Sequence, residues 1–307
     1  MKKSIAFLFF LVIPFFATAK VLVITHNYNR PDFIEMQYKT FKKFLHDEYE
    51  YVVFNDARQE TMKTQIDAMC AKYQIRCIRI PQEIHSRPYL PREPSDDLVN
   101  NASIRHANCV QYSLDVLGYD YPGIVFIIDT DVALIRSFSI EQYMQDKDIA
   151  ARINRPRNKA RYCSPLFCML HMSKLPEKHA INFNCGVING VSGDTGAWTY
   201  YYLLKHPELR VVPVRMTFSH QLFLADNHIN VFVNTSTPDD YKRGFYEHFG
   251  FNDAEIEFLL KKPDTFEFYL DNFFLHYRGS SYSTGDDYKL LIFNEFINRI
   301  LQEDYCE

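Results

Sequence analysis

This sequence has few glycines, no cysteines at metal-binding spacing and no net positive charge. Its 307 residues include 10 glycines, which is few for an enzyme built on glycine-rich phosphate loops. The seven cysteines show no metal-ligand spacing, and their odd number leaves at least one without a disulfide partner in its own chain. The formal net charge is −4, so bulk electrostatics indicate no nucleic-acid partner.

Two cysteine pairs are close enough in sequence to be candidate disulfides after export, Cys70 with Cys77 and Cys163 with Cys168. A chain of this length does not need a disulfide framework. Small buried apolar thiols are therefore the simpler interpretation of most of these residues.

Apolar and aromatic side chains are abundant instead. Hydrophobic residues make up 47% of the chain and aromatic residues 16%, which supports a large core and argues against disorder. The length allows one large or two small domains. Because no linker or repeat divides the chain, we predict a single domain over residues 20–307, with halves at 20–135 and 136–307.

The N-terminus has the pattern of a secretory signal peptide. A basic start at Lys2 and Lys3 precedes an apolar run over residues 5–16, and Ala17-Thr18-Ala19 fits a small-residue cleavage site. The apolar run is shorter than the roughly 20 residues that a membrane span needs. We therefore expect residues 1–19 to be removed from an exported chain, secreted or lumenal, that keeps no stable membrane span. An uncleaved N-terminal anchor is the alternative.

The first half alternates strands with helices. We predict strands over residues 20–25, 50–54, 75–80 and 123–128, and helices over 31–47, 60–73 and 101–117. This alternation indicates an α/β fold with a mostly parallel central sheet flanked by helices.

The second half is less regular, and we expect it to be smaller and mixed. Its predicted strands are 149–153, 182–189, 229–233 and 266–275, and its predicted helices are 195–204, 219–227, 252–261 and 286–301. Five basic residues lie between Arg152 and Arg161. They indicate either a solvated loop or a contact with a polar or anionic substrate.

The stretch from Gly123 to Asp131 is the centre of the functional prediction. An apolar run typical of a strand buried on both faces ends in Asp129-Thr130-Asp131. Ligands bind at the carboxyl ends of the strands in open α/β sheets. Since hard divalent cations prefer carboxylate and phosphate oxygens, the two aspartates predict a metal–phosphate site.

Four features together resemble the GT-A nucleotide-diphospho-sugar glycosyltransferases, in the glycogenin-like and galactosyltransferase-like branch. They are the first strand with the polar loop that follows it (20–31), Asp129-Thr130-Asp131, the segment from Asn184 to Val187, and the segment from His276 to Gly279. The resemblance implies a GT-A (Rossmann-like) fold in which 20–135 binds the nucleotide and 136–307 the sugar and acceptor. It also implies Mn²⁺ or Mg²⁺ held by Asp129, Asp131 and His276.

The resemblance further implies the donor contacts, with a UDP-sugar favoured and a carbohydrate or glycosylated acceptor. Asp56 can accept a hydrogen bond from a pyrimidine or form an Asx turn; Arg105 can bind phosphate or ribose or form a surface ion pair. The donor-binding residues that we expect are Thr25, His26, Asn27, Asp56, Arg105, Asp129, Asn184, Gly186, Gln221 and Arg278.

One departure from the family pattern concerns the chemistry. Relatives carry Asp-Gln on a helix where this chain has His220-Gln221, so the usual carboxylate is absent. Asp194 is the remaining candidate for a catalytic carboxylate. A non-catalytic GT-A-like protein that binds nucleotide or carbohydrate is therefore the main alternative. A D-x-D phosphohydrolase is disfavoured, because there the motif follows the first strand and here three strands precede it.

Overall fold

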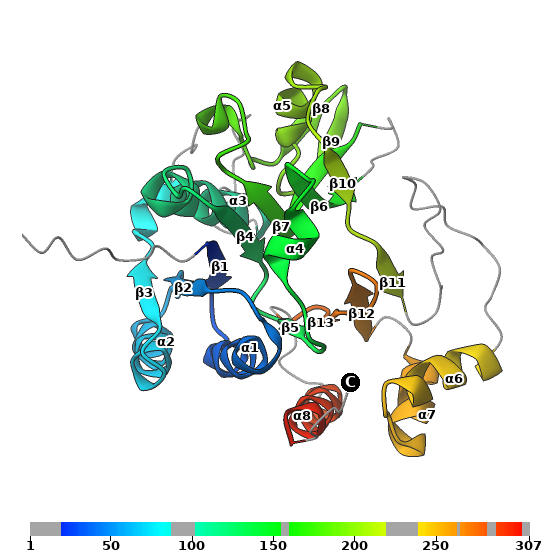
Figure 1. Ribbon diagram of the computed structural model, residues 1–307. Coiled ribbons are helices and arrows are strands. Elements are labelled where there is room, and N and C mark those ends of the chain that lie inside the picture. Colours follow the sequence, from blue (N-terminus) through cyan, green and yellow to red (C-terminus); the bar gives the residue numbers. More distant parts are fainter. Residues whose placement is uncertain are drawn as a thin grey trace, which may run out of the picture.

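The computed structural model describes residues 20–86, 102–154, 160–218, 239–262, 265–280 and 287–302. Figure 1 shows the arrangement of its helices and strands. The helical segments are α1 (Pro31–Phe44), α2 (Glu60–Lys72), η1 (Gln82–Ser86), α3 (Ala102–Ser113), η2 (Leu114–Gly118), α4 (Ile140–Met144), η3 (Lys178–Ala180), α5 (Thr199–Lys205), α6 (Asp239–His248), α7 (Asp253–Lys261) and α8 (Asp287–Gln302). The strands are β1 (Val21–Asn27), β2 (Tyr49–Asn55), β3 (Arg76–Arg79), β4 (Ile124–Ile128), β5 (Val132–Leu134), β6 (Ile149–Asn154), β7 (Tyr162–His171), β8 (Gly186–Ile188), β9 (Val191–Gly193), β10 (Val211–Pro213), β11 (Met216–Phe218), β12 (Phe266–Tyr269) and β13 (Phe274–Tyr277).

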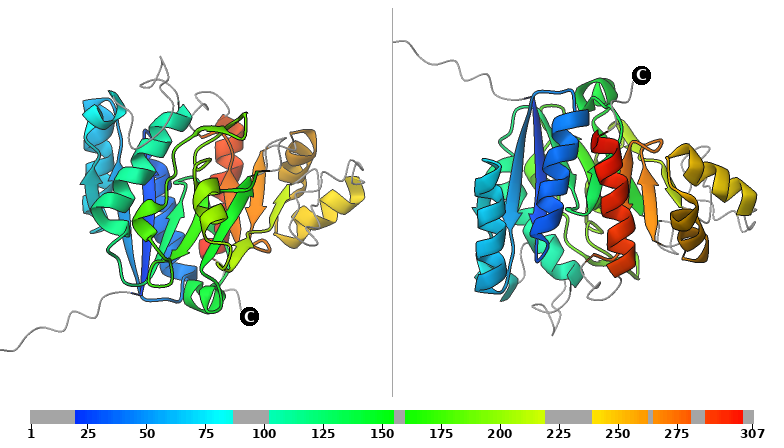
Figure 2. Two further views of the ribbon diagram at one scale, coloured as in Figure 1. Left: turned by 90° about the horizontal axis from the view of Figure 1, so that it is seen from above. Right: turned by 90° about the horizontal axis from the view of Figure 1, so that it is seen from below.

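The central sheet has seven strands in the order β10-β6-β7-β4-β1-β2-β3. The pairs β3–β2, β2–β1, β1–β4 and β6–β10 are parallel, whereas β7 runs antiparallel to both β4 and β6. Helices α1, α2 and α8 lie on one face of the sheet and α3 on the other (Figures 1 and 2). The predicted α/β class with a mostly parallel sheet is confirmed.

Strand β1 shows why the middle of this sheet is buried on both sides. Val21 and Val23 belong to the apolar cluster beneath α1 and α8, while Leu22 and Ile24 belong to the cluster on the α3 face. All four side chains have no exposed area. Because successive side chains of a strand point to opposite faces, a continuous apolar run predicts this double burial.

A smaller antiparallel sheet, β11-β12-β13-β5, continues from the end of β4. The single strand predicted for 266–275 is wrong: the segment is a hairpin of β12 and β13. Leu270, Asp271 and Asn272 all have positive φ at its turn. The aromatic residues on both sides give no sequence signal for such a turn. His276 lies on β13, which pairs directly with β5, so the hairpin places it next to the D-x-D turn.

Other predictions are corrected in their bounds. The strand expected at 182–189 is confined to β8, which pairs with β9, and the helix expected at 195–204 begins at Thr199 as α5. Strand β7, with ten residues, was not predicted. The expected helix at 219–227, the expected strand at 229–233 and the signal peptide at 1–19 lie outside the described residues. In the described ranges, no helix has both the length and the apolar character required to cross a membrane.

Candidate functional site

The Asp129-Thr130-Asp131 turn lies at the carboxyl end of β4 and is fixed by β1 and α1. The buried side-chain amide of Gln37 donates to the carbonyls of Asp129 and Val132, each at 2.8 Å. The Thr130 hydroxyl donates to the carbonyl of His26 at 2.8 Å and accepts from the Thr25 hydroxyl at 3.1 Å. Both backbone and side-chain contacts therefore hold the turn at the carboxyl edge of the parallel strands.

Asp131 and His276 come together across two strands of the small sheet. The backbone N–H of Tyr277 donates to the Asp131 carbonyl at 2.9 Å, and His276 pairs with Val132 in the β5–β13 register. The His276 Nε2 and Asp131 Oδ1 atoms are 3.4 Å apart, and both side chains are more than nine-tenths buried. The structure thus brings two of the three predicted metal ligands into contact.

Their charges act on each other. Burial alone would lower the pKa of His276, but Asp131 and Glu267 outweigh it and raise that pKa to about 10. Burial would likewise raise the pKa of Asp131, but His276 and a side-chain hydrogen bond from Ser280 hold it below its usual range. When His276 is protonated, its imidazolium lies between the carboxylates of Asp131 and Glu267.

Asp129 faces a different histidine. Its Oδ1 atom lies 3.4 Å from His106 Nε2 of α3, and its backbone N–H donates to the Leu166 carbonyl of β7 at 3.0 Å. Burial raises the pKa of Asp129, His106 opposes that rise, and Asp131 adds to it. Asp129 therefore lies within electrostatic reach of Asp131, while its nearest ionisable contact is His106.

Arg152 of β6 has anionic surroundings in the same region. Burial would lower its pKa, but Tyr269, Glu267, Asp129 and Asp194 together raise it. Its Nε atom is buried without a hydrogen-bond partner among the described residues. Arg152 belongs to the basic segment for which the sequence leaves a solvated loop and a substrate contact open. Of its two members in the described ranges, Arg152 and Arg161, it is Arg152 that has an aspartate of the turn among the groups acting on it, whereas Arg161 lines a different part of the surface.

Glu267 of β12 is a site residue that sequence reasoning missed. It is 1% exposed and binds His276 Nδ1 at 2.8 Å through Oε2, while Oε1 pairs with Arg278 Nε at 2.9 Å. The Tyr269 hydroxyl also donates to it. The signal was present in the sequence as one acidic residue in the otherwise aromatic strand Phe266–Tyr269.

Asp56, at the end of β2, forms a closed ion-pair cluster. Its carboxylate accepts from Arg105 Nε at 2.7 Å and Nη2 at 2.8 Å, and it lies 2.8 Å from His85 Nε2. Gln82 also donates to it, at 3.2 Å. Burial would raise the Asp56 pKa, but His85 and Arg105 hold it below its usual range. The ion pair of Arg105 is thus buried rather than on the surface.

The same cluster includes Cys109, and ligand atoms of Asp56, His85 and Cys109 lie within 4.8 Å of one another. The donor set suits a metal poorly. Arg105 already binds both oxygens of the carboxylate, and its fixed positive charge would repel a cation. Burial raises the pKa of the Cys109 thiol, whereas metals bind thiolates.

The predicted residues at the end of β1 have structural partners. Thr25 contacts the D-x-D turn through the Thr130 hydroxyl. His26 Nε2 lies 2.9 Å from the Ser113 hydroxyl, and burial lowers the His26 pKa to about 3. Asn27 binds both backbone groups of Arg30, closing the loop into α1. These residues line the same sheet edge as the D-x-D turn.

The remaining predicted residues are spread over the second half. Asn184 is fully buried, and Gly186 has φ of 153° with the Trp198 indole 2.7 Å from where a Cβ would lie, so only glycine fits there. Asp194 accepts from the Thr195 N–H at 2.7 Å. Gln221, with His220, lies outside the described residues.

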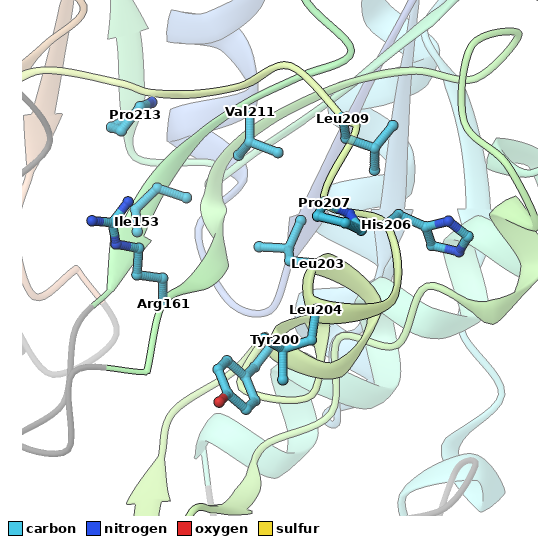
Figure 3. Close-up of a pocket in the computed structure, with 10 residues that line it drawn as sticks. All are labelled: Ile153, Arg161, Tyr200, Leu203, Leu204, His206, Pro207, Leu209, Val211 and Pro213. Carbon is cyan, nitrogen blue, oxygen red and sulfur yellow. The ribbon is translucent and has the colours of Figure 1, made fainter.

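A cavity of about 420 Å³ opens elsewhere, between β6, α5 and β10 (Figure 3). Its walls are mainly apolar, and no carboxylate lines it among the described residues. It is therefore separate from the aspartate sites. The lining residues are Ile153, Arg161, Tyr200, Leu203, Leu204, His206, Pro207, Leu209, Val211 and Pro213.

No protein-family model and no curated protein sequence matches the chain. Among solved structures, it is similar to the mannosyltransferase PcManGT from Pyrobaculum calidifontis in complex with GDP-Man and Mn²⁺, at 14% identity and a TM-score of 0.38 over 64% of this chain and 54% of that one. An active-site mutant of LgtC matches at 14% identity and a TM-score of 0.33 over 50% of this chain and 58% of that one.

Glucosyl-3-phosphoglycerate synthase from Mycobacterium tuberculosis, solved with Mn²⁺, UDP and glucosyl-3-phosphoglycerate, matches at 12% identity and a TM-score of 0.38 over 64% of this chain and 70% of that one. In the first two matches the chain spans little more than half of the other protein. The neighbours include nucleotide-sugar glycosyltransferases, but the TM-scores of all three matches are below 0.5. We therefore base the function on the residues of this chain.

Proposed function

We propose that the protein is a metal-dependent glycosyltransferase that moves a sugar from a nucleotide-diphosphate donor to an acceptor. The observation that carries the proposal is the 3.4 Å separation of Asp131 Oδ1 and His276 Nε2 at the carboxyl edge of the parallel strands. Two ligands bound at right angles at about 2.1 Å from one ion lie roughly 3 Å apart. The pair is therefore spaced for a shared cation.

The donor set fits Mn²⁺ or Mg²⁺. Asp129, Asp131 and His276 are the residues that would hold the ion, two of them oxygen donors and one a nitrogen donor. When bound, the cation supplies Lewis-acid stabilisation of the negative charge that develops on a diphosphate leaving group. The raised pKa of His276 favours a ring protonated on both nitrogens. Metal binding at Nε2 therefore displaces the Nε2 proton.

The chain's own residues supply rigidity and charge. Gln37 and Thr130 keep the turn in place, so the carboxylates need little reorganisation when they bind. Arg152 adds positive charge near Asp129, and Arg278 adds it beside Glu267, which favours an anionic donor. Asp56 and Arg105 enter the proposal as a pair, since Asp56 fixes the guanidinium that would face the donor.

We propose the remaining roles on the sequence pattern. Asp129 contacts the donor ribose as well as the cation, and Asp194 is the candidate catalytic carboxylate. A UDP-sugar is the favoured donor and a carbohydrate or glycosylated molecule the acceptor. The other proposed donor contacts are Thr25, His26, Asn27, Asp56, Arg105, Asn184, Gly186, Gln221 and Arg278. We also propose that the chain is exported after removal of residues 1–19.

The test is incubation of the mature chain with Mn²⁺ and a panel of nucleotide sugars, alone and with carbohydrate acceptors. We expect transfer or donor hydrolysis in the wild type. In Asp131→Ala we expect both to be lost, together with roughly 100-fold weaker Mn²⁺ binding. Mn²⁺-dependent donor binding that survives Asp131→Ala unchanged would remove the basis of the proposal. Nucleotide binding without turnover would identify a binding protein, and phosphate release from simple phosphomonoesters a phosphohydrolase.

A further inference from the structure

Glu267 is a buried carboxylate that the proposed chemistry does not use directly. It lies on β12 between Phe266 and Phe268, and all three side chains are essentially unexposed. An unpaired charge in such a place is strongly unfavourable, so its partners explain why it is tolerated. These partners are His276, Arg278 and Tyr269.

The hairpin register sets the geometry of the contact with His276. Glu267 and His276 are directly paired residues of β12 and β13, so their side chains leave the sheet on the same face. On its other edge β13 pairs with β5, where His276 is opposite Val132. The imidazole is therefore held between the Glu267 carboxylate and Asp131.

The two ring nitrogens differ in how tightly they are held. Nδ1 lies 2.8 Å from Glu267 Oε2, a normal distance for a charge-assisted hydrogen bond, whereas Nε2 lies 3.4 Å from Asp131 Oδ1. A metal binds an imidazole through a nitrogen that carries no proton. When Nε2 is that nitrogen, Nδ1 keeps the remaining proton and donates it to Glu267.

We propose that Glu267 is a positioning residue that fixes the orientation and tautomer of His276 for metal binding through Nε2. The inference rests on the proposed function, because it concerns the same metal site. Glu267 also binds Arg278 through its other oxygen, so one carboxylate links the metal ligand to a proposed donor-binding residue. His276 and Arg278 lie on opposite oxygens of the carboxylate, so a glutamine here would present its acceptor oxygen to one of them and its NH₂ donor to the other.

The experiment measures Mn²⁺ dissociation constants by electron paramagnetic resonance, without substrate, for the wild type and for Glu267→Gln. We expect binding to weaken about 10- to 100-fold in the variant. The matched control is Glu255→Gln. Glu255 is also a buried carboxylate, 2% exposed, paired with Arg299 at 3.0 Å, but it caps α7 outside the site. That control should lose stability and keep the wild-type Mn²⁺ affinity.

A double-mutant cycle separates positioning from a general effect of charge. In a His276→Ala background, Glu267→Gln should change the Mn²⁺ affinity little further, because Glu267 acts through the imidazole. An equal loss in both backgrounds, or unchanged affinity in folded Glu267→Gln, would overturn the inference. Absence of Mn²⁺ binding in the wild type would instead contradict the proposed function. Glu267→Asp, which keeps the charge but shortens the side chain, takes the place of Glu267→Gln if the latter does not fold.

Discussion

Asp56 follows β2 and Asp131 follows β4, the two strands on either side of β1 in the central sheet, yet the surroundings of the two carboxylates differ. Asp56 meets a guanidinium through two hydrogen bonds of 2.7 and 2.8 Å, with His85 and Gln82 as further partners. Asp131 faces an imidazole at 3.4 Å. A carboxylate at the end of a buried strand can thus be a structural anion in one place and a prospective metal ligand in the other. Its partners decide between the two roles.

The physical difference lies in what each partner does when the aspartate is removed. Without the Asp56 carboxylate, the buried guanidinium of Arg105 would be left with Gln82 and the backbone carbonyl of residue 56. His276 can lose its proton and keeps Glu267 as a partner. We therefore expect the first cluster to contribute to stability in addition to its proposed donor contacts, and the second to exchange a proton for the proposed cation.

The largest expected effect is on stability at Asp56. Asp56→Ala should lower the free energy of unfolding by about 3–5 kcal/mol, the usual loss when one partner of a buried ion pair is removed. Asp131→Ala should cost less in metal-free protein, because His276 can become neutral while it keeps Glu267 as a partner. Urea denaturation of both variants, followed by circular dichroism, makes the comparison.

The double variant Asp56→Ala/Arg105→Met is the control for this prediction. It removes both charges, so it should be more stable than Asp56→Ala alone. If Asp131→Ala destabilises the protein as much as Asp56→Ala does, the distinction between the two clusters is lost.

The sequence was sufficient for the parts of the fold that depend on local pattern. The apolar runs of β1 and β4 and the amphipathic α1 follow from periodicity, and the sheet is mostly parallel as predicted. Strand β7 could not be found in this way. It pairs with β4 and β6 on its two sides, but its register shifts beside Ala151 and Arg152, and Pro165 interrupts its sequence.

For the site, the sequence identified the residue types but not their partners. The contact of His276 with Asp131 was expected from a motif; the contact with Glu267 depends on a hairpin register that the aromatic run did not reveal. The buried pair of Asp56 and Arg105 was also missed as a pair. These residues are 49 positions apart, and only the packing of α3 against the sheet brings them together.

The pH dependence of stability is a second, smaller way to separate the clusters. Asp56 has a lowered pKa in the folded protein, so it contributes stability above its unfolded value near pH 4 and loses it as the pH falls through the folded value. The difference in unfolding free energy between the wild type and Asp56→Asn should therefore be full at about pH 6 and shrink below about pH 4. Urea titrations across this range measure it; a difference that does not change with pH would contradict the ion-pair assignment.

The smallest expected effect concerns the outer side of Arg105. Its guanidinium carbon lies 4.9 Å from the centre of the Tyr28 ring, which is 37% exposed. Such a partly exposed cation–π contact is worth about 0.5–1 kcal/mol, so Tyr28→Leu should lower the unfolding free energy by that amount. Tyr28→Phe keeps the ring face and should leave stability unchanged. Equal losses in the two variants would show that the hydroxyl, and not the ring face over Arg105, is responsible; the Asp56 cluster would then end at the guanidinium.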